Sequence, residues 1–308
     1  MNKKEFRTLD EQIDILKAKG LIINNEQDVK DILFRENYFF INGYRFLFYT
    51  KDRKFIKGTT FSELYSAFLF DRNLRNVLFK NLLVVENNIK SVISYQLSKK
   101  YGYKEKDYLN PKNFNQDYKE NRRVEDVLNK VQRQIRVNGD KHTATSHYIN
   151  KYKYVPLWIL VKVLSFGLIN ELYGILKPED KNEIADYYKL SPEELKTYLQ
   201  LLSNYRNLCA HEDMVYNHRT QISIDNTIYH KLLNIKKDEF DEYVNGKNDI
   251  FSIVIILKRM LQKERFNEFI REINRIIDSF DKNVDTIPIE YLLGKMGFPL
   301  NYNEIIDL

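Results

Sequence analysis

Residues 61–101 read FSELYSAFLFDRNLRNVLFKNLLVVENNIKSVISYQLSKKY and form the longest uninterrupted helical pattern in the sequence. Apolar residues recur there at helical spacing without any proline, which predicts one long helix or two abutting helices. The whole chain of 308 residues has 43% hydrophobic and 30% charged residues, with only 10 Gly and 6 Pro. This composition favours helices, so we expect an all-α fold built around residues 61–101.

Shorter helical patterns lie on both sides of this stretch. They predict helices over residues 8–19, 26–35, 121–137, 156–175, 179–188, 192–210, 249–262, 264–281 and 289–296. We interpret the aromatic stretch 38–55 as an irregular loop or a short hairpin. Residues 236–247 are charged and end near Gly246, so they are the best boundary candidate. We therefore expect a helical domain over residues 1–235 and a C-terminal helical extension over residues 236–308.

The segment that ends in RNLCAH, residues 206–211, is the best candidate for chemistry. Its helix begins with Ser191, Pro192 and Glu194, which form a capping box with a proline in the first turn. The apolar stripe of this helix consists of Leu195, Tyr198, Leu199, Leu202, Tyr205 and Cys209. On a helical wheel of about 100° per residue, Arg206 falls inside the stripe, and His211, five residues on, lies roughly 140° away from Arg206 if the helix continues. An arginine is therefore placed on an apolar helix face.

A guanidinium on an apolar face requires an anionic partner, because an unpaired buried charge is costly. One interpretation is a structural ion pair between Arg206 and a glutamate elsewhere in the core. The other is an arginine that binds phosphate beside a histidine that transfers protons near neutral pH. The same spacing also occurs at Arg136 and His142, but the turn-like residues 138–140 separate that pair. We therefore prefer Arg206 and His211.

The motif from Arg206 to His211 resembles the R-N-x-x-x-H motif of HEPN ribonucleases. Its continuation through residues 216–217 is similar to bacterial abortive-infection (Abi) proteins of the AbiD/AbiF-like group. Other stretches resemble the same group: residues 9–21, Asn37–Tyr44, Phe70-Asp71 with Leu74-Arg75, Glu86 with Lys90, and Pro156-Leu157-Trp158 with Ser165-Phe166-Gly167. One departure is Met214, where the group often carries a basic residue. Together the matches span roughly residues 8–218, which makes them more specific than any single motif.

This resemblance implies a HEPN-like helical bundle and a metal-independent endoribonuclease in phage defence. The expected catalytic residues are His211 as acid and base, Arg206 as phosphate stabiliser, and Asn207 as the residue that orients backbone or substrate. Cleavage that leaves a 2′,3′-cyclic phosphate needs two proton-transfer groups and a cation. A two-fold homodimer that brings two motif helices together would supply them, and small Cys209 and Ala210 would help the helices approach. The resemblance implies the same composite site, and also an inhibitory small RNA or antitoxin protein.

The charge distribution permits RNA as a partner. The formal net charge is +6, and basic residues outnumber acidic ones from residue 119 to 153. On a helix, Arg122, Arg133 and Arg136 would share one face, so we interpret them as RNA-binding candidates. The alternative is an ordinary solvated helix face.

The remaining features concern location and cofactors. A single cysteine excludes an intrachain disulfide and fits a reducing cytoplasm. We see no signal peptide, no membrane-spanning stretch and no Cys/His spacing typical of a zinc site, so we expect a cytoplasmic protein without metal or cofactor.

Two rival functions remain open: a non-catalytic RNA-binding module that uses Arg206, and a helical scaffold in which Arg206 is only ion-paired.

Overall fold

The computed structural model describes residues 5–308, and these residues fold into α-helices and short 3-10 helices without a β-strand. The predicted all-α fold is confirmed. The α-helices are α1 Leu9–Ala18, α2 Glu26–Glu36, α3 Tyr38–Asn42, α4 Phe61–Tyr101, α5 Glu105–Tyr108, α6 Asn121–Asn138, α7 Thr143–Tyr152, α8 Leu157–Leu160, α9 Phe166–Gly174, α10 Pro178–Tyr187, α11 Pro192–Ala210, α12 Ile228–Leu232, α13 Ile250–Met260, α14 Lys263–Asp281 and α15 Ile289–Met296. The 3-10 helices are η1 Gly43–Leu47, η2 Pro111–Asn113 and η3 Tyr302–Ile306.

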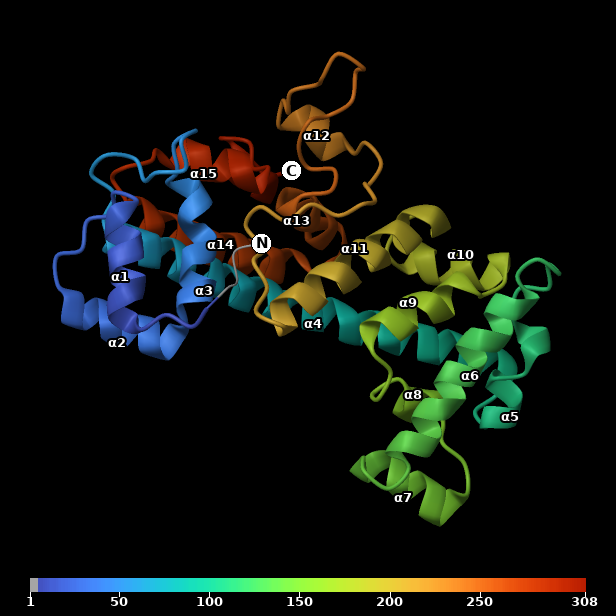
Figure 1. The fold of residues 1–308 in the computed structure, drawn as a ribbon. Helices are drawn as coiled ribbons and strands as arrows, with labels where there is room; N and C mark the ends of the chain where they lie inside the picture. The colour runs from blue at the N-terminus through green and yellow to red at the C-terminus, as the bar shows by residue number, and fades with distance from the viewer. Residues whose placement is uncertain (1–4) are drawn as a thin grey trace.

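Helix α4 is the spine of the molecule, and it is one continuous helix. It begins in a capping box, in which Thr60 Oγ1 accepts from the N–H of Glu63 and Glu63 Oε2 accepts from the N–H of Thr60. Figure 1 shows α4 running across the molecule, with α11 and α14 against it. Its buried residues recur at helical spacing along most of its length, which explains why other helices pack along it. None of the helices in residues 5–308 is long and apolar enough to span a bilayer.

Residues 236–308 supply α13, α14 and α15. Helix α14 packs along α4, and α13 packs against α11. The carboxylate of Glu63, at the start of α4, accepts hydrogen bonds from the backbone N–H groups of Asp285 and Thr286 at 2.9 Å each. The C-terminal helices therefore share the hydrophobic core with the helices that precede them.

The segment 156–175 differs from the single helix that we expected. It forms two helices, α8 and α9, because Ser165 caps the second one by accepting a hydrogen bond from the N–H of Leu168. Trp158 lies in α8 and is 45% exposed, so this tryptophan is not a core residue. Residues 38–55 are also more helical than expected, since α3 and η1 occupy most of their first half.

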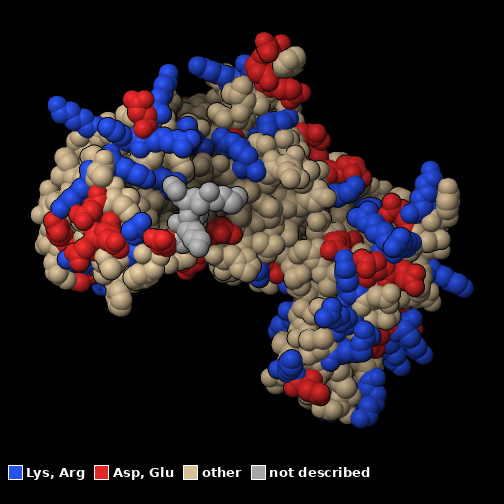
Figure 2. Space-filling view, viewed as in Figure 1, with Lys and Arg blue, Asp and Glu red and all other residues tan. Residues whose placement is uncertain are grey.

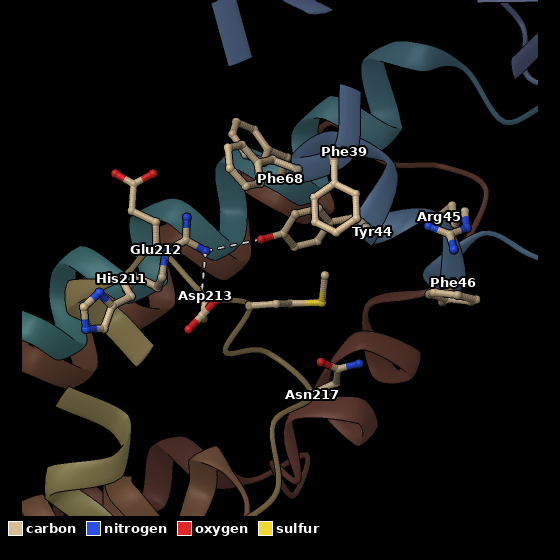
Figure 3. A pocket seen from close by; sticks show the side chains of 13 residues that line it. Phe39, Tyr44, Arg45, Phe46, Phe68, His211, Glu212, Asp213 and Asn217 are labelled. Carbon is tan, nitrogen blue, oxygen red and sulfur yellow. Dashed lines mark hydrogen bonds between the residues drawn. The ribbon is translucent and has the colours of Figure 1, made fainter. Parts of the chain in front are cut away.

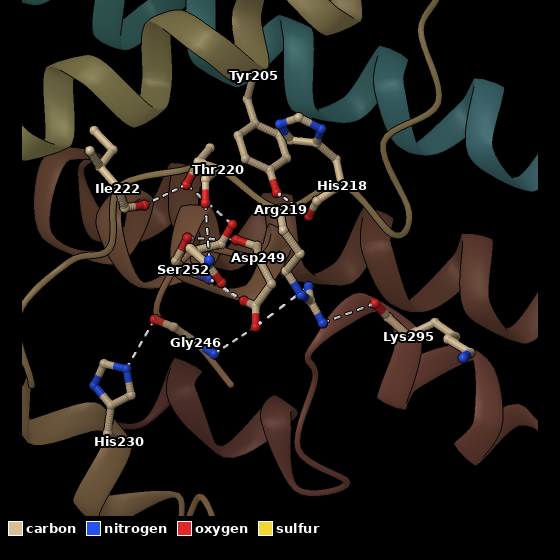
Figure 4. A network of polar contacts seen from close by, with 11 residues as sticks. Tyr205, His218, Arg219, Thr220, Ile222, His230, Gly246, Asp249, Ser252 and Lys295 are labelled. Atoms are coloured by element: carbon tan, nitrogen blue, oxygen red, sulfur yellow. Dashed lines mark hydrogen bonds and ion pairs between the residues drawn. The ribbon is translucent and has the colours of Figure 1, made fainter. Parts of the chain in front are cut away.

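A polar network ties α13 to the segment that follows α11 (Figure 4). The carboxylate of Asp249 caps α13, accepting from the N–H of Gly246 at 2.9 Å and from the N–H of Ser252 at 3.1 Å. Arg219 forms an ion pair with Asp249 at 3.6 Å. Burial nevertheless raises the pKa of Asp249 to about 6. The hydroxyl of Tyr205 in α11 donates to the carbonyl of His218, which fixes the same segment from the other side.

His230, which is fully buried beside this network, makes the stability depend on pH. Its Nδ1 accepts from the N–H of Thr227 and its Nε2 donates to the carbonyl of Gly246, so the ring is neutral. Burial lowers the pKa of His230. Below about pH 6.5 the imidazole of His230 is protonated in the unfolded chain but stays neutral in the folded chain. The free energy of unfolding therefore decreases as the pH falls below that value.

We therefore expect His230→Asn to destabilise the protein most at pH 7.5 and progressively less towards pH 5.5. The contribution of His230 changes by up to about 1.4 kcal/mol per pH unit in this range. Urea unfolding of both proteins at several pH values measures the difference. Asp249 titrates in the opposite direction and is present in both proteins, so it cancels. A cost of substitution that stays constant with pH would contradict a neutral buried ring.

Candidate active site

Helix α11 carries the predicted motif as expected. Ser191 and Glu194 form the predicted capping box, with Ser191 Oγ accepting from the N–H of Glu194 at 3.2 Å. The six residues of the predicted apolar stripe are all buried. The stripe packs against α4, α9 and α13, and this packing sets the direction in which the end of the helix points.

Arg206 lies between α11 and α4. Its Nε donates to Glu86 Oε2 at 3.1 Å, and its guanidinium lies over the ring of Phe79 with 5.7 Å to the centroid. Glu86 also pairs with Lys90 at 2.7 Å. The ion pair with a core glutamate is therefore confirmed. The side chain of Arg206 is still 29% exposed, and its two terminal nitrogens make no hydrogen bond within residues 5–308.

His211 ends the helix. Its N–H donates to the carbonyl of Asn207 at 3.0 Å, so the helical turn continues up to this residue. The side chains of both residues are exposed. The next residue, Glu212, has φ 58°, a left-handed conformation that turns the chain away from the helix. After this turn His211 lines the edge of a cavity of about 470 Å³, and Figure 3 shows its imidazole turned away from the aromatic residues of that cavity.

Asp71 in α4 holds the segment after His211 in place. Its carboxylate is fully buried and accepts from the N–H groups of Val215 and Tyr216, the latter at 2.8 Å. It also accepts from the hydroxyl of Tyr44 at 2.7 Å and pairs with Arg75 at 2.5 Å. One buried carboxylate thus joins η1, α4 and the chain that leaves α11.

The two motif residues point towards neighbouring parts of α4. Arg206 contacts Phe79 and Glu86, whereas His211 lines the cavity together with Arg75, which lies one helical turn before Phe79. The end of α11 therefore places a histidine at the edge of the cavity and an arginine against the adjoining face of α4. An exposed imidazole and a partly exposed guanidinium on one helix end are suited to proton transfer and to binding phosphate.

Cys209 and Ala210 behave differently from each other. Cys209 is 8% exposed, and burial raises the pKa of its thiol to about 12. It faces the core of its own chain, so the expectation that it lets a second helix approach was wrong. Ala210 is exposed, and of the two it is the residue that a partner helix can reach.

The three predicted RNA-binding arginines lie on α6. Arg122, Arg133 and Arg136 are all exposed, and none of them forms an ion pair within residues 5–308. Helix α6 packs on α9, and Figure 1 shows it well away from the end of α11. Figure 2 shows many Lys and Arg side chains over this part of the molecule. One chain therefore does not bring these arginines together with His211.

His142 belongs to a local structure rather than to a second motif. Helix α6 ends at Asn138, and His142 caps the next helix, α7, with its Nδ1 accepting from the N–H of Thr145. The turn that we expected between Arg136 and His142 is confirmed. Helix α7 itself was missed, because its polar residues lack a strong apolar period.

Several residues of the site could not be assigned from the sequence alone. Glu86 and Asp71 belong to stretches that resemble the family, but the sequence does not identify their partners. A signal was present, because both have a basic residue four positions later on the buried stripe of α4. Phe39 and Phe40 belong to the stretch Asn37–Tyr44 that resembles the family, but nothing in the sequence placed them or Phe46 at a cavity.

The fold and this site define an all-α protein whose buried carboxylates on a long central helix organise the end of a second helix. A family model described as Abi-like protein matches residues 31–217, more than half of the chain. The chain belongs to this family. No match was found among curated proteins or among solved structures. The matched range contains α3 to α11, and therefore Tyr44, Asp71, Glu86, Arg206 and His211.

Proposed function

We propose that this Abi-like protein is a metal-independent endoribonuclease of the HEPN type that acts in phage defence by abortive infection. The observation that carries the proposal is the position of His211. His211 is exposed at the edge of the 470 Å³ cavity, at the end of a helix that also carries the partly exposed Arg206. Membership in the Abi-like family supports the role in defence. The Arg206-Asn207 and His211 pattern supports the HEPN type, and the motifs outside α11 support the AbiD/AbiF-like group.

The proposed reaction uses two copies of the chain. His211 of one protomer takes the proton from the ribose 2′-OH, and the 2′-oxygen attacks the phosphorus. The bond from phosphorus to the 5′-oxygen breaks, and His211 of the partner subunit donates a proton to that oxygen. Arg206 stabilises the pentavalent phosphate through its terminal nitrogens, while Nε stays on Glu86. The products are a 2′,3′-cyclic phosphate and a 5′-hydroxyl.

A second candidate is a non-catalytic RNA-binding module, because the terminal nitrogens of Arg206 can hold phosphate while its Nε stays on Glu86. Glu86 already neutralises part of the guanidinium, and Lys90 adds a further cation beside the same carboxylate. A site of this composition can hold phosphate without transferring protons. In that case RNA would bind in a salt-dependent manner and would remain intact.

The experiment that tests the proposal is incubation of the purified protein with end-labelled RNA of mixed sequence in the presence of EDTA. Cleavage that leaves cyclic phosphate and 5′-hydroxyl ends supports the metal-independent ribonuclease. Tight binding without cleavage favours the binding module. Sedimentation of the same sample shows whether the chain is a dimer, as the composite site requires.

We expect Arg122, Arg133 and Arg136 to contribute to RNA affinity through phosphate contacts. Replacing all three with Gln should weaken binding and lower the slope of log affinity against log salt by about 2, because each lost contact with single-stranded RNA contributes roughly 0.7. Filter binding at several salt concentrations measures the slope. The matched control replaces the exposed residues Arg271, Arg275 and Lys282, in and just after α14. Equal slopes for the two triple variants would show that α6 has only a solvated face.

A further inference from the structure

The cavity beside His211 has aromatic walls that the fold does not require. Phe39, Phe40 and Phe46 are 76%, 55% and 57% exposed, although they lie within eight residues of one another. Single exposed apolar residues are common, but a group of them around one cavity indicates a binding site. The guanidinium of Arg45 lies over the ring of Phe46, 4.2 Å from the centroid, and adds a cation at the rim.

The opposite part of the cavity is polar. Asp213 and Asn217 line it, and both are exposed. Figure 3 shows Phe39, Tyr44 and Phe68 grouped on one side and these two polar residues on another. The hydroxyl of Tyr44 is already bound to Asp71, so the neutral amide and the carboxylate that can bind a ligand come from the segment after α11. A planar ligand with polar edges fits such a combination of aromatic rings, an amide and a carboxylate.

We propose that this cavity binds an unstacked nucleobase of single-stranded RNA, next to the phosphate that His211 acts on. The inference rests on the proposed function and names its substrate class. Bases that are free of a duplex stack on aromatic side chains and expose polar edges to amides and carboxylates. The volume of about 470 Å³ is in the range of sites for small ligands, which accommodates a base with its ribose. Duplex RNA offers neither a free base face nor a free Watson–Crick edge, so we do not expect it to enter this cavity.

An apolar side chain of a partner protein would also cover the phenylalanines. It would, however, leave Asp213 and Asn217 without partners, and it would not explain why the aromatic group adjoins His211. The nucleobase accounts for both halves of the cavity. Binding of a protein side chain in the cavity is therefore one of the results that the test can distinguish.

The test uses the full chain with His211→Ala, so that RNA is not cleaved during the measurement. The probe is a short single-stranded RNA that contains 2-aminopurine, whose fluorescence is quenched when it stacks on an aromatic ring. Phe39→Ala is compared with Phe34→Ala, a matched control because Phe34 is 79% exposed on α2 and does not line the cavity. We expect Phe39→Ala to weaken binding roughly fivefold to a hundredfold and to abolish the quenching, as the loss of one stacked base predicts. Phe34→Ala should change neither.

Equal affinity and equal quenching in the two variants would overturn the inference. So would a Phe39→Ala variant that binds RNA normally but changes the monomer–dimer ratio, because the cavity would then contact protein. RNA cleavage by the wild type and by Phe39→Ala, both with His211 intact, distinguishes a failure of the base site from a failure of the proposed ribonuclease activity. Cleavage at the wild-type rate by Phe39→Ala leaves the ribonuclease in place and removes the base site. Binding that depends on Phe39, without any cleavage by the wild type, keeps the base site and removes the ribonuclease.

Discussion

His211→Ala should reduce the rate of RNA cleavage by about a hundredfold to ten-thousandfold, the range in which one acid or base group contributes to a reaction. The substitution should leave the fold intact, because the imidazole is exposed and only the backbone of His211 completes the end of α11. The rate is measured with end-labelled RNA in EDTA, and circular dichroism checks the helix content. If the proposed role in defence is correct, cells that express this variant should be less protected against phage than cells that express the wild type.

The matched control is His147→Ala. His147 is an exposed histidine on α7, in a part of the molecule that Figure 1 shows away from the end of α11. It should cleave RNA at the wild-type rate. Retained cleavage by purified His211→Ala would remove His211 from the mechanism, whereas an equal loss in both variants would indicate that the effect is not specific to this site.

Asp71→Asn should lower the free energy of unfolding by about 3–5 kcal/mol, because it leaves the buried guanidinium of Arg75 without a carboxylate. The side chains of Asp71 and Arg75 are 0% and 4% exposed, so water cannot compensate for the lost charge. The amide also has a single acceptor oxygen for the four groups that now donate to the carboxylate. Urea unfolding measures the loss.

Asp52→Asn provides the control, since Asp52 is exposed in a turn. Its carboxylate accepts no hydrogen bond and forms no ion pair within residues 5–308. It should change the stability by less than about 0.5 kcal/mol. The Asp71 variant should also lose RNA cleavage before it unfolds, because Asp71 positions the chain at Val215 and Tyr216 beside the cavity. A stability loss below about 1 kcal/mol would show that this carboxylate does not anchor the segment.

The helical elements were predictable because their signals are local. Capping boxes act over three residues, and apolar periodicity acts over three or four, so α4 and α11 could be placed closely from the sequence. The misplaced elements follow the same rule. The serine cap at Ser165, which divides residues 156–175, lies within an apolar stretch that resembles one continuous helix, and α7 has a polar composition that weakens its periodicity.

The candidate site was predictable only in part. The sequence placed Arg206 on an apolar face and required an anionic partner, which is Glu86. It could not choose Glu86 among the other carboxylates of the chain. The burial of Cys209 also depends on which neighbour covers the end of α11, and this neighbour was unknown.

The sequence by itself determined the all-α class, the two central helices, the family resemblance and the choice of Arg206, Asn207 and His211 as candidates. Only the tertiary structure decided that Arg206 pairs with a residue 120 positions away and that Asp71 joins Tyr44 to Val215 and Tyr216. It also decided that aromatic residues before α4 line the cavity beside His211. The physical reason is the separation along the sequence over which each interaction acts. Helix formation depends on neighbours within a few residues, whereas ion pairs between helices and cavities depend on how distant side chains pack.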